Sequence, residues 1–148
     1  MKKSIFKIIL TLLLVLILGC SAAPLNTYAA TKTTAAAKKR IAKKFYKQLK
    51  KSYKNNESWN INVKYKKTGN RYTYTVTMTS IQMDLDYIRG AAFVDGDNYG
   101  AMLKALVKNN KEDYRDAKKS GLKKPIVYLV WMSSDGYKVA TFKNGSIQ

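Results

Sequence analysis

Two segments in which large apolar and small polar residues alternate place the strongest constraint on the fold. In the first, Trp59, Ile61, Val63 and Tyr65 alternate with Asn and Lys, and in the second, Tyr72, Tyr74, Val76 and Met78 alternate with Thr. Successive side chains of a strand point to opposite faces, so each segment predicts a strand with one buried face. The intervening Lys67-Thr68-Gly69-Asn70 predicts a turn. We expect a hairpin that pairs Tyr65 with Tyr72 and buries all eight apolar residues on one face.

Two longer segments repeat apolar residues at spacings of three and four, which indicates amphipathic helices. The first runs from about Ala35 to Tyr53, and the second from about Tyr99 to Ser120. The residues from Asp95 to Asn98 supply capping groups for the second helix, and Gly121 suits its C-terminal cap. Both helices carry basic residues opposite the apolar stripe, so each predicts one packed and one solvated face.

The remaining segments predict further strands. Residues 126–132 are apolar on both faces, as expected of a central strand, and Asp135-Gly136 is a strong two-residue turn before a strand from Tyr137 to Phe142. Residues 81–94 also alternate, but out of phase with the strand before them. This segment predicts either a bulge near Ser80 or a separate strand.

The predicted order is therefore helix, strand, strand, a doubtful strand, helix, strand, strand. It indicates an α+β fold in which two helices pack on an antiparallel sheet of four to five strands. A long first helix followed by paired hairpins loosely resembles cystatin-like architecture. Cystatin protease inhibitors carry a Gln-Val-Gly type loop on the first hairpin, where this chain has Lys67-Thr68-Gly69-Asn70. The resemblance therefore does not imply protease inhibition.

The first twenty residues predict export across the cytoplasmic membrane. Lys2, Lys3 and Lys7 precede an apolar run from Ile8 to Leu18. The run is shorter than the ~20 residues that a membrane-spanning helix needs, so it is typical of a cleaved signal peptide. We therefore expect residues 1–20 to be a signal peptide, residues 21–37 to be a flexible Ala, Thr and Ser-rich tether, and residues 38–148 to form a single domain.

Two processing routes fit this leader. Ile17-Leu18-Gly19-Cys20 resembles a bacterial lipobox, which implies cleavage before Cys20 and attachment of a lipid to its thiol, with the protein anchored at the outer face of the membrane. Alternatively, the A-x-A-like Thr27-Tyr28-Ala29 predicts cleavage after Ala29 and secretion. Cys20 is the only cysteine of the chain, so neither route leaves a disulfide framework.

The charge of the chain predicts anionic partners. It has 28 Lys and Arg against 9 Asp and Glu, so loss of the three leader lysines leaves a net charge of about +16. Outside a cell this charge favours anionic lipid head groups or phosphate-bearing wall polymers, with nucleic acid possible but less favoured. An envelope protein is a further candidate partner.

The excess charge is concentrated on the first predicted helix. Eight basic residues fall in one arc opposite its apolar stripe: Lys39, Arg40, Lys43, Lys44, Lys47, Lys50, Lys51 and Lys54. Several form like-charge pairs four residues apart, which together cost about 1 to 2 kcal/mol unless an anion relieves them. A charged arc is commonly only a solvated face, but the missing counter-charges favour a polyanion-binding surface.

The residue inventory predicts no catalytic residues, no metal site and no cofactor. The chain has no histidine, which removes most serine, cysteine and zinc chemistry. Carboxylates such as Asp84, Asp86, Asp97 and Glu57 show no paired context for acid and base roles. The segment Asp95 to Gly100 is similar to the start of a calcium loop, but Tyr99 and Leu106 replace two required ligands, so it predicts a turn and helix cap. A histidine-free secreted enzyme is the weakest alternative.

A second candidate surface lies on the predicted central strand. Tyr128, Val130 and Met132 share a face with Ile126, and we expect Tyr137 and Val139 to join it. This face is too apolar to remain wet if the helices cover the other side of the sheet. Either residues 81–94 cover it or a protein partner does, so a protein-binding module is the alternative function.

Overall fold

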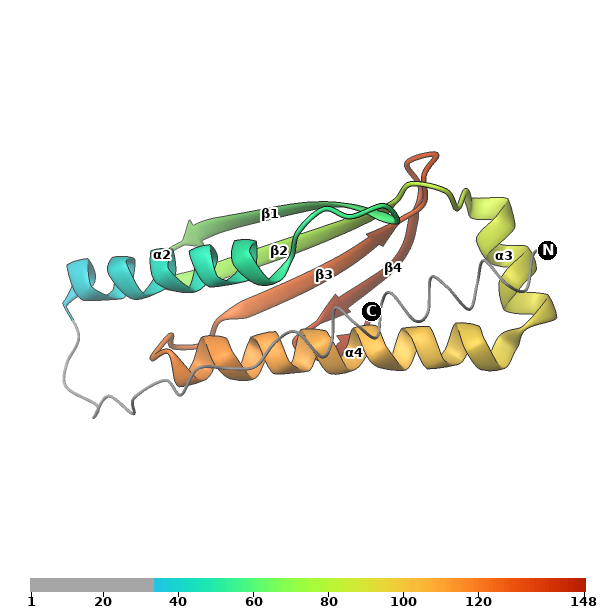
Figure 1. Ribbon diagram of the computed structural model, residues 1–148. Helices are drawn as coiled ribbons and strands as arrows, with labels where there is room; N and C mark the ends of the chain where they lie inside the picture. The colour runs from blue at the N-terminus through green and yellow to red at the C-terminus, as the bar shows by residue number, and fades with distance from the viewer. Residues whose placement is uncertain (1–33) are drawn as a thin grey trace.

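The computed structural model describes residues 34–148 (Figure 1), and the predicted signal peptide, Cys20 and most of the predicted tether lie outside them. The elements follow the order α2 (Ala35–Ser52), β1 (Trp59–Thr68), β2 (Arg71–Ser80), α3 (Leu85–Val94), α4 (Gly96–Lys119), β3 (Ile126–Met132), β4 (Lys138–Lys143) and β5 (Ser146–Ile147). Residues 35–37, assigned to the tether from the sequence, are helical, because the Thr34 hydroxyl caps α2 by accepting from the Ala37 N–H at 3.3 Å. Within the described range, no helix is long and apolar enough to span a membrane.

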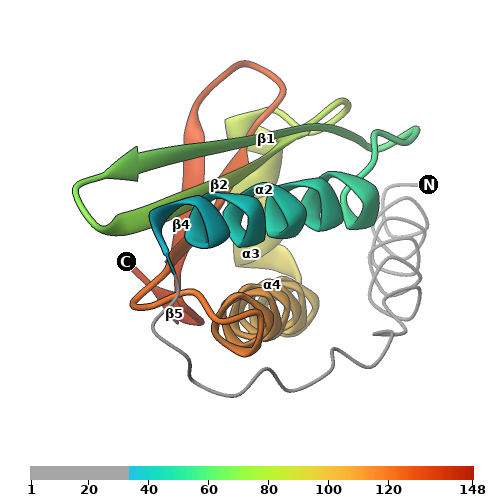
Figure 2. The same ribbon diagram turned by 90° about the vertical axis from the view of Figure 1, so that its left-hand side faces the viewer.

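The fold is α+β, as predicted, with five strands in the order β1-β2-β3-β4-β5. Helices α2 and α4 lie on the same side of this sheet (Figure 2). The prediction of a wholly antiparallel sheet is wrong at one pair, since β2 and β3 are parallel. After β2 the chain passes through α3, and α4 then carries it back along the sheet, so β3 starts from the same end as β2 (Figure 1).

The first hairpin buries the predicted face in a shifted register. Tyr65 pairs with Tyr74 rather than Tyr72, because Gly69 and Asn70 alone form the loop, with Gly69 at a φ of 57°. A two-residue loop of this kind favours glycine at its first position. Since side chains alternate with a period of two, a shift of two residues leaves every side chain on its predicted face.

The doubtful strand of residues 81–94 is a helix, α3, so the fold has three helices within the described range. The Asp84 carboxylate caps α3 by accepting from the Tyr87 N–H at 2.7 Å. The apparent alternation arose from Met83, buried in the loop before the helix, and from residues of the first helical turn. Ile88 is the buried residue of α3, which packs against α4.

The core lies between the helices and the sheet. Helix α2 contributes Ala42, Phe45 and Leu49, and the two tryptophans, Trp59 and Trp131, meet edge to face with ring centres 6.2 Å apart. The hydroxyl of buried Tyr74 donates to the Ala42 carbonyl at 3.2 Å, and burial raises the pKa of this tyrosine well above its usual value. The edge-to-face contact between Phe45 and Tyr74, at 4.9 Å, adds to this packing and fixes α2 beneath β1 and β2.

One polar residue in α4 ties the helix to the far strands. Asn110 is 0 % exposed, and its amide donates to the Val127 carbonyl at 3.0 Å. Its side-chain oxygen accepts from the Gly145 N–H at 2.6 Å, in the turn between β4 and β5. Both the nitrogen and the oxygen of the buried Asn110 amide therefore have a hydrogen-bond partner, as is usual for buried polar groups. The two bonds link α4 to β3 and to the turn between β4 and β5.

Candidate functional site

The basic face of α2, made of the eight arc residues predicted from the sequence, is fully presented to solvent. Its apolar stripe packs toward the sheet, which turns the opposite side of the helix outward. All eight side chains are exposed: Lys39, Arg40, Lys43, Lys44, Lys47, Lys50, Lys51 and Lys54. Seven of them lie on α2 and Lys54 follows its C-terminal cap, so the cationic surface runs along about three and a half turns of the helix and just past its end.

The basic face has no carboxylate partner among the described residues. The ion pairs within this range join Arg89 to Asp86 and Lys119 to Asp116, and both lie on other helices. The Lys50 ammonium lies 5.8 Å from the centre of the Tyr46 ring, a weak cation–π contact. The like-charge repulsion expected from the sequence therefore remains unrelieved by the folded domain.

The outer face of α4 differs from the basic face of α2 in its balance of charge. It also exposes basic residues, among them Lys104, Lys108 and Arg115, but α4 carries four carboxylates of its own. These are Asp97, Glu112, Asp113 and Asp116. Helix α4 is therefore an internal reference for lysines on a mixed-charge surface.

The predicted apolar strip on β3 lies on the side of the sheet away from the helices. Val127, Leu129 and Trp131 are buried toward the helices, whereas the alternate residues are only half-buried and lie outside the core. These are Ile126, Tyr128, Val130 and Met132. Segment 81–94 does not cover the strip, because α3 packs on α4.

Two residues expected on this strip lie elsewhere. Tyr137 is in the turn before β4 with 60 % of its surface exposed, and Val139 packs against the core. The cause is a register shift between Trp131 and Met132, which reverses the expected alternation at the start of β4. The strip is consequently one strand wide, with Thr75 and Lys143 as the cross-strand neighbours of Tyr128.

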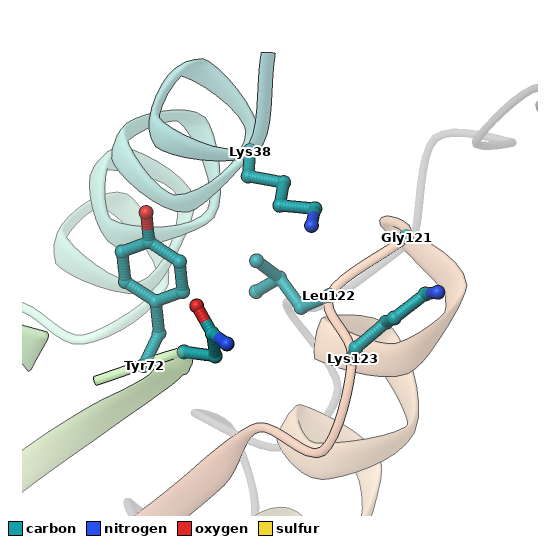
Figure 3. Close-up of a pocket in the computed structure, with 6 residues that line it drawn as sticks. Lys38, Tyr72, Gly121, Leu122 and Lys123 are labelled. Atoms are coloured by element: carbon teal, nitrogen blue, oxygen red, sulfur yellow. The ribbon is translucent and has the colours of Figure 1, made fainter. Parts of the chain in front are cut away.

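A small hollow opens beside the N-terminal end of α2 (Figure 3). Three segments that are distant in the sequence meet there: the first turn of α2, the loop between β1 and β2, and the connection from α4 to β3. The hollow has a volume of about 280 Å³ and is lined by Lys38, Asn70, Tyr72, Gly121, Leu122 and Lys123. No carboxylate lines it, so its polar groups are mainly hydrogen-bond donors.

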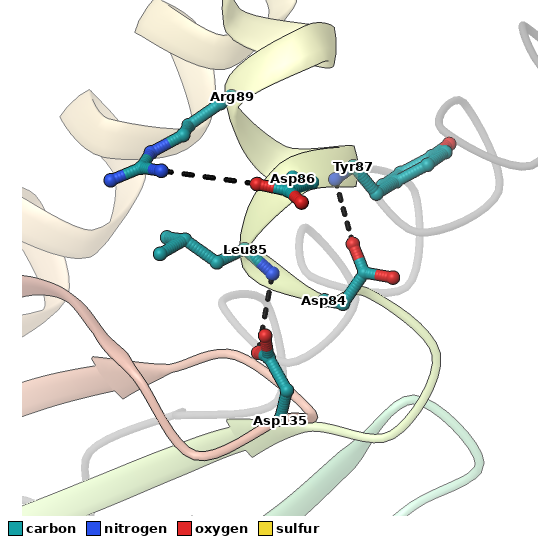
Figure 4. Close-up of polar contacts among 6 residues, drawn as sticks. All are labelled: Asp84, Leu85, Asp86, Tyr87, Arg89 and Asp135. Carbon is teal, nitrogen blue, oxygen red and sulfur yellow. Dashed lines mark hydrogen bonds and ion pairs between the residues drawn. The ribbon is translucent and has the colours of Figure 1, made fainter.

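The carboxylates at the opposite end of the molecule stabilise loops and helix ends (Figure 4). Asp84 caps α3, Asp135 accepts from the Leu85 N–H at 3.2 Å, and Asp86 pairs with Arg89. Asp95 is the N-cap residue of α4, but its side chain accepts from the Asn98 side-chain amide at 2.7 Å and makes no capping bond to the backbone, so the predicted side-chain cap is not formed. Among residues 34–148, no three His, Cys, Asp or Glu side chains gather as metal ligands would.

Asp113 is an ionisable group whose environment the sequence analysis missed. Its carboxylate accepts a 2.6 Å hydrogen bond from the Tyr53 hydroxyl, which links the end of α2 to α4. The pKa of Asp113 is raised from 3.8 to about 7, chiefly by burial and also by the nearby charges of Asp116 and Glu112, against the opposing effect of the Tyr53 hydrogen bond. The spacing Leu106, Asn110, Asp113 continues the apolar stripe of α4, and this was the available signal of burial.

The Asp113 carboxyl predicts a dependence of stability on pH. Because its pKa is higher in the folded protein than in the unfolded chain, the folded state holds the proton more tightly, and stability falls as pH rises from about 4 to about 7. We expect Asp113→Asn to remove this fall, so that the variant exceeds the wild type in stability at pH 8 and matches it at pH 4. Urea unfolding across this range measures the effect. Asp97→Asn, at an exposed position of α4, should retain the fall, and an unchanged pH profile in Asp113→Asn would contradict the assignment.

The comparisons with known proteins add no family to this description. No family model, curated protein or solved structure matches the chain.

Proposed function

We propose that this protein is a small, non-catalytic, exported binding or accessory module whose basic face contacts anionic envelope material. The observation that supports the proposal is the set of eight exposed basic side chains, seven on α2 and Lys54 just after it, with no carboxylate partner among the described residues. A cationic surface of this kind attracts phosphate-bearing polymers and lipid head groups at long range. Their condensed counterions are released on contact, which favours binding at low salt.

The proposed location follows from the leader. If Cys20 carries a lipid, the protein is tethered to the outer face of the membrane. The lipobox resemblance implies a diacylglycerol at Cys20, and a neighbouring basic surface would add about 1 kcal/mol per Lys or Arg near an anionic leaflet to this anchor. If cleavage follows Ala29 instead, the same surface would hold a secreted protein to wall polymer.

The test is binding of the chain beginning at Ala30 to poly(glycerol phosphate) and to vesicles containing phosphatidylglycerol. If about four cationic contacts form, affinity for the polymer should fall about 50-fold between 50 and 200 mM salt. A variant with Lys43→Gln, Lys44→Gln and Lys47→Gln should bind at least about tenfold more weakly at low salt and show a shallower salt dependence. Lys50 is left in place because it contacts Tyr46.

The matched control removes the same charge from α4, with Lys104→Gln, Lys108→Gln and Arg115→Gln. We expect this variant to lose less than about threefold in affinity, because only net charge has changed. The α2 variant should also unfold at slightly higher denaturant, since several like-charge pairs are gone. Equal losses of binding in the two variants, or none in either, would make the basic face a solvated surface.

A protein-binding module is the second candidate function. The uncovered, half-buried strip of Ile126, Tyr128, Val130 and Met132 favours it. Binding through this strip would respond little to salt, because apolar burial is not screened. Val130→Lys would then abolish binding to the partner while leaving polymer binding unchanged.

A further inference from the structure

We propose that the hollow beside the start of α2 is a phosphate-binding subsite that receives a single phosphate ester. It deepens the proposed function, on which it rests for the identity of the ligand. The subsite is separate from the basic face, because none of the eight arc residues lines it. It would hold one phosphate group at a fixed position while the arc attracts the rest of the anion.

Lys38 occupies an unusual position on α2. It stands four residues before Ala42 and so continues the stripe that buries Ala42, Phe45 and Leu49. At the edge of the core, this position of the stripe would be expected to hold an apolar residue, but the sequence has a lysine there. Its ammonium points into the hollow (Figure 3) and forms no ion pair with any described carboxylate.

The lining of the hollow selects an anion. The Lys38 ammonium and the Asn70 amide are donors, and an ammonium cannot accept a hydrogen bond. Lys123 also lines the hollow, but its ammonium points away from Lys38 (Figure 3). Lys38 and Asn70 are exposed, and no acidic residue lines the hollow to pair with the Lys38 ammonium. A phosphate oxygen fits these donors, since it is charged and accepts several hydrogen bonds.

The shape of the hollow limits the size of the ligand. Its volume of about 280 Å³ lies at the lower end of the ~300 to 1,000 Å³ found for small-molecule sites. The Tyr72 ring and the Leu122 side chain form apolar walls beside the donors (Figure 3). These walls suit a phosphate carrying a small substituent, such as the glycerol phosphate unit of a lipid head group or of a wall polymer.

Charge at the two ends of the molecule supports the same assignment. The hollow end gathers basic residues of the loops that form it: Arg71, Lys123 and Lys124 beside Lys38. The carboxylates of Asp84, Asp86 and Asp135 lie at the opposite end, near α3 (Figures 1 and 4). Asp116 lies in the last turn of α4, close to the connection that lines the hollow, but it pairs with Lys119 at 3.8 Å and does not line the hollow.

The experiment is an amide-resolved NMR titration of the chain beginning at Ala30 with inorganic phosphate, glycerol phosphate and phosphatidylglycerol vesicles. We expect saturable shifts at Asn70, Gly121, Leu122 and Lys123. Lys38→Gln should lower the affinity for the two soluble ligands, inorganic phosphate and glycerol phosphate, about tenfold, because a charged hydrogen bond is lost. Lys104→Gln is the matched control, since it removes the same charge from an exposed position of α4 outside both the hollow and the basic face, and it should change this affinity less than twofold.

The outcomes separate the ligand sources and the two proposals. Saturable shifts with glycerol phosphate assign the subsite to a soluble or polymeric ester, and shifts with vesicles alone assign it to a membrane lipid. Shifts that do not saturate, or equal losses in Lys38→Gln and Lys104→Gln, would overturn the subsite. Since polymer binding is tested by the Lys43, Lys44 and Lys47 changes, failure of the subsite would leave the proposed function of the basic face standing.

Discussion

Asn110→Ala should lower the free energy of unfolding by about 2 to 3 kcal/mol, combining an unsatisfied buried amide with a small cavity. The Gly145 N–H would lose its 2.6 Å acceptor, whereas the Val127 carbonyl would still accept from the Asn144 N–H at 3.0 Å. The lost stability should therefore come mainly from the Gly145 N–H, which is left without this acceptor in the turn between β4 and β5. Urea unfolding followed by tryptophan fluorescence is suited to the measurement, because both tryptophans are buried in the core.

Asn109→Ala is the control for this change. Asn109 is the adjacent residue of α4 and is only half-buried, so we expect its truncation to alter stability by less than about 0.5 kcal/mol. A comparable loss in both variants would mean that the side-chain bridge of Asn110 is not responsible, since alanine has the higher helix propensity and the substitution itself favours the helix. No loss in Asn110→Ala would contradict the role of this amide.

Gly145→Ala should lower the free energy of unfolding by about 2 to 4 kcal/mol, for two separable reasons. Gly145 has a φ of 88°, which L residues other than glycine rarely adopt. A Cβ there would also lie 2.6 Å from the Lys111 Cβ and 3.0 Å from its Cα. These atoms belong to α4 itself, so the turn must move, and the bond from Gly145 to Asn110 would lengthen.

Gly136→Ala separates the two reasons. Gly136 has nearly the same φ, 86°, but a Cβ there would meet nothing within 4 Å. We expect this variant to lose only about 1 to 2 kcal/mol, from backbone strain. The difference between the two variants measures the contact with α4. If Gly136→Ala were as destabilising as Gly145→Ala, the close approach of the turn to Lys111 would carry no energy.

The sequence predicted those elements of the fold that are recognised by a short repeat of apolar residues, every second residue in a strand or every third and fourth in a helix. The alternation from Trp59 to Met78 correctly identified the buried face of the first hairpin, and the three and four spacing identified α2 and α4. The register was wrong because it depends on how many residues the loop contains, and Gly69 permits a two-residue loop. Segment 81–94 was misread because four alternating residues span a loop and one helical turn.

Long-range features of the fold could not be read from the sequence. The parallel pairing of β2 with β3 follows from the direction in which α4 returns the chain, which no local pattern records. The hollow combines Lys38, Asn70 and Lys123, which are brought together only by the packing of α2 and the ends of two connections. For the basic face, in contrast, the helical period alone was sufficient, because seven of its eight residues lie on one helix and Lys54 follows directly after it.

Lysine footprinting tests the proposed polyanion contact most directly. The chain beginning at Ala30 would be acetylated with and without poly(glycerol phosphate) at 50 mM salt, and the modification of each lysine measured by mass spectrometry. We expect Lys43, Lys44 and Lys47 to be protected, with Lys104 and Lys108 on α4 modified as fast as in the free protein. Equal protection on both helices, or none on α2, would contradict a binding surface on the basic face.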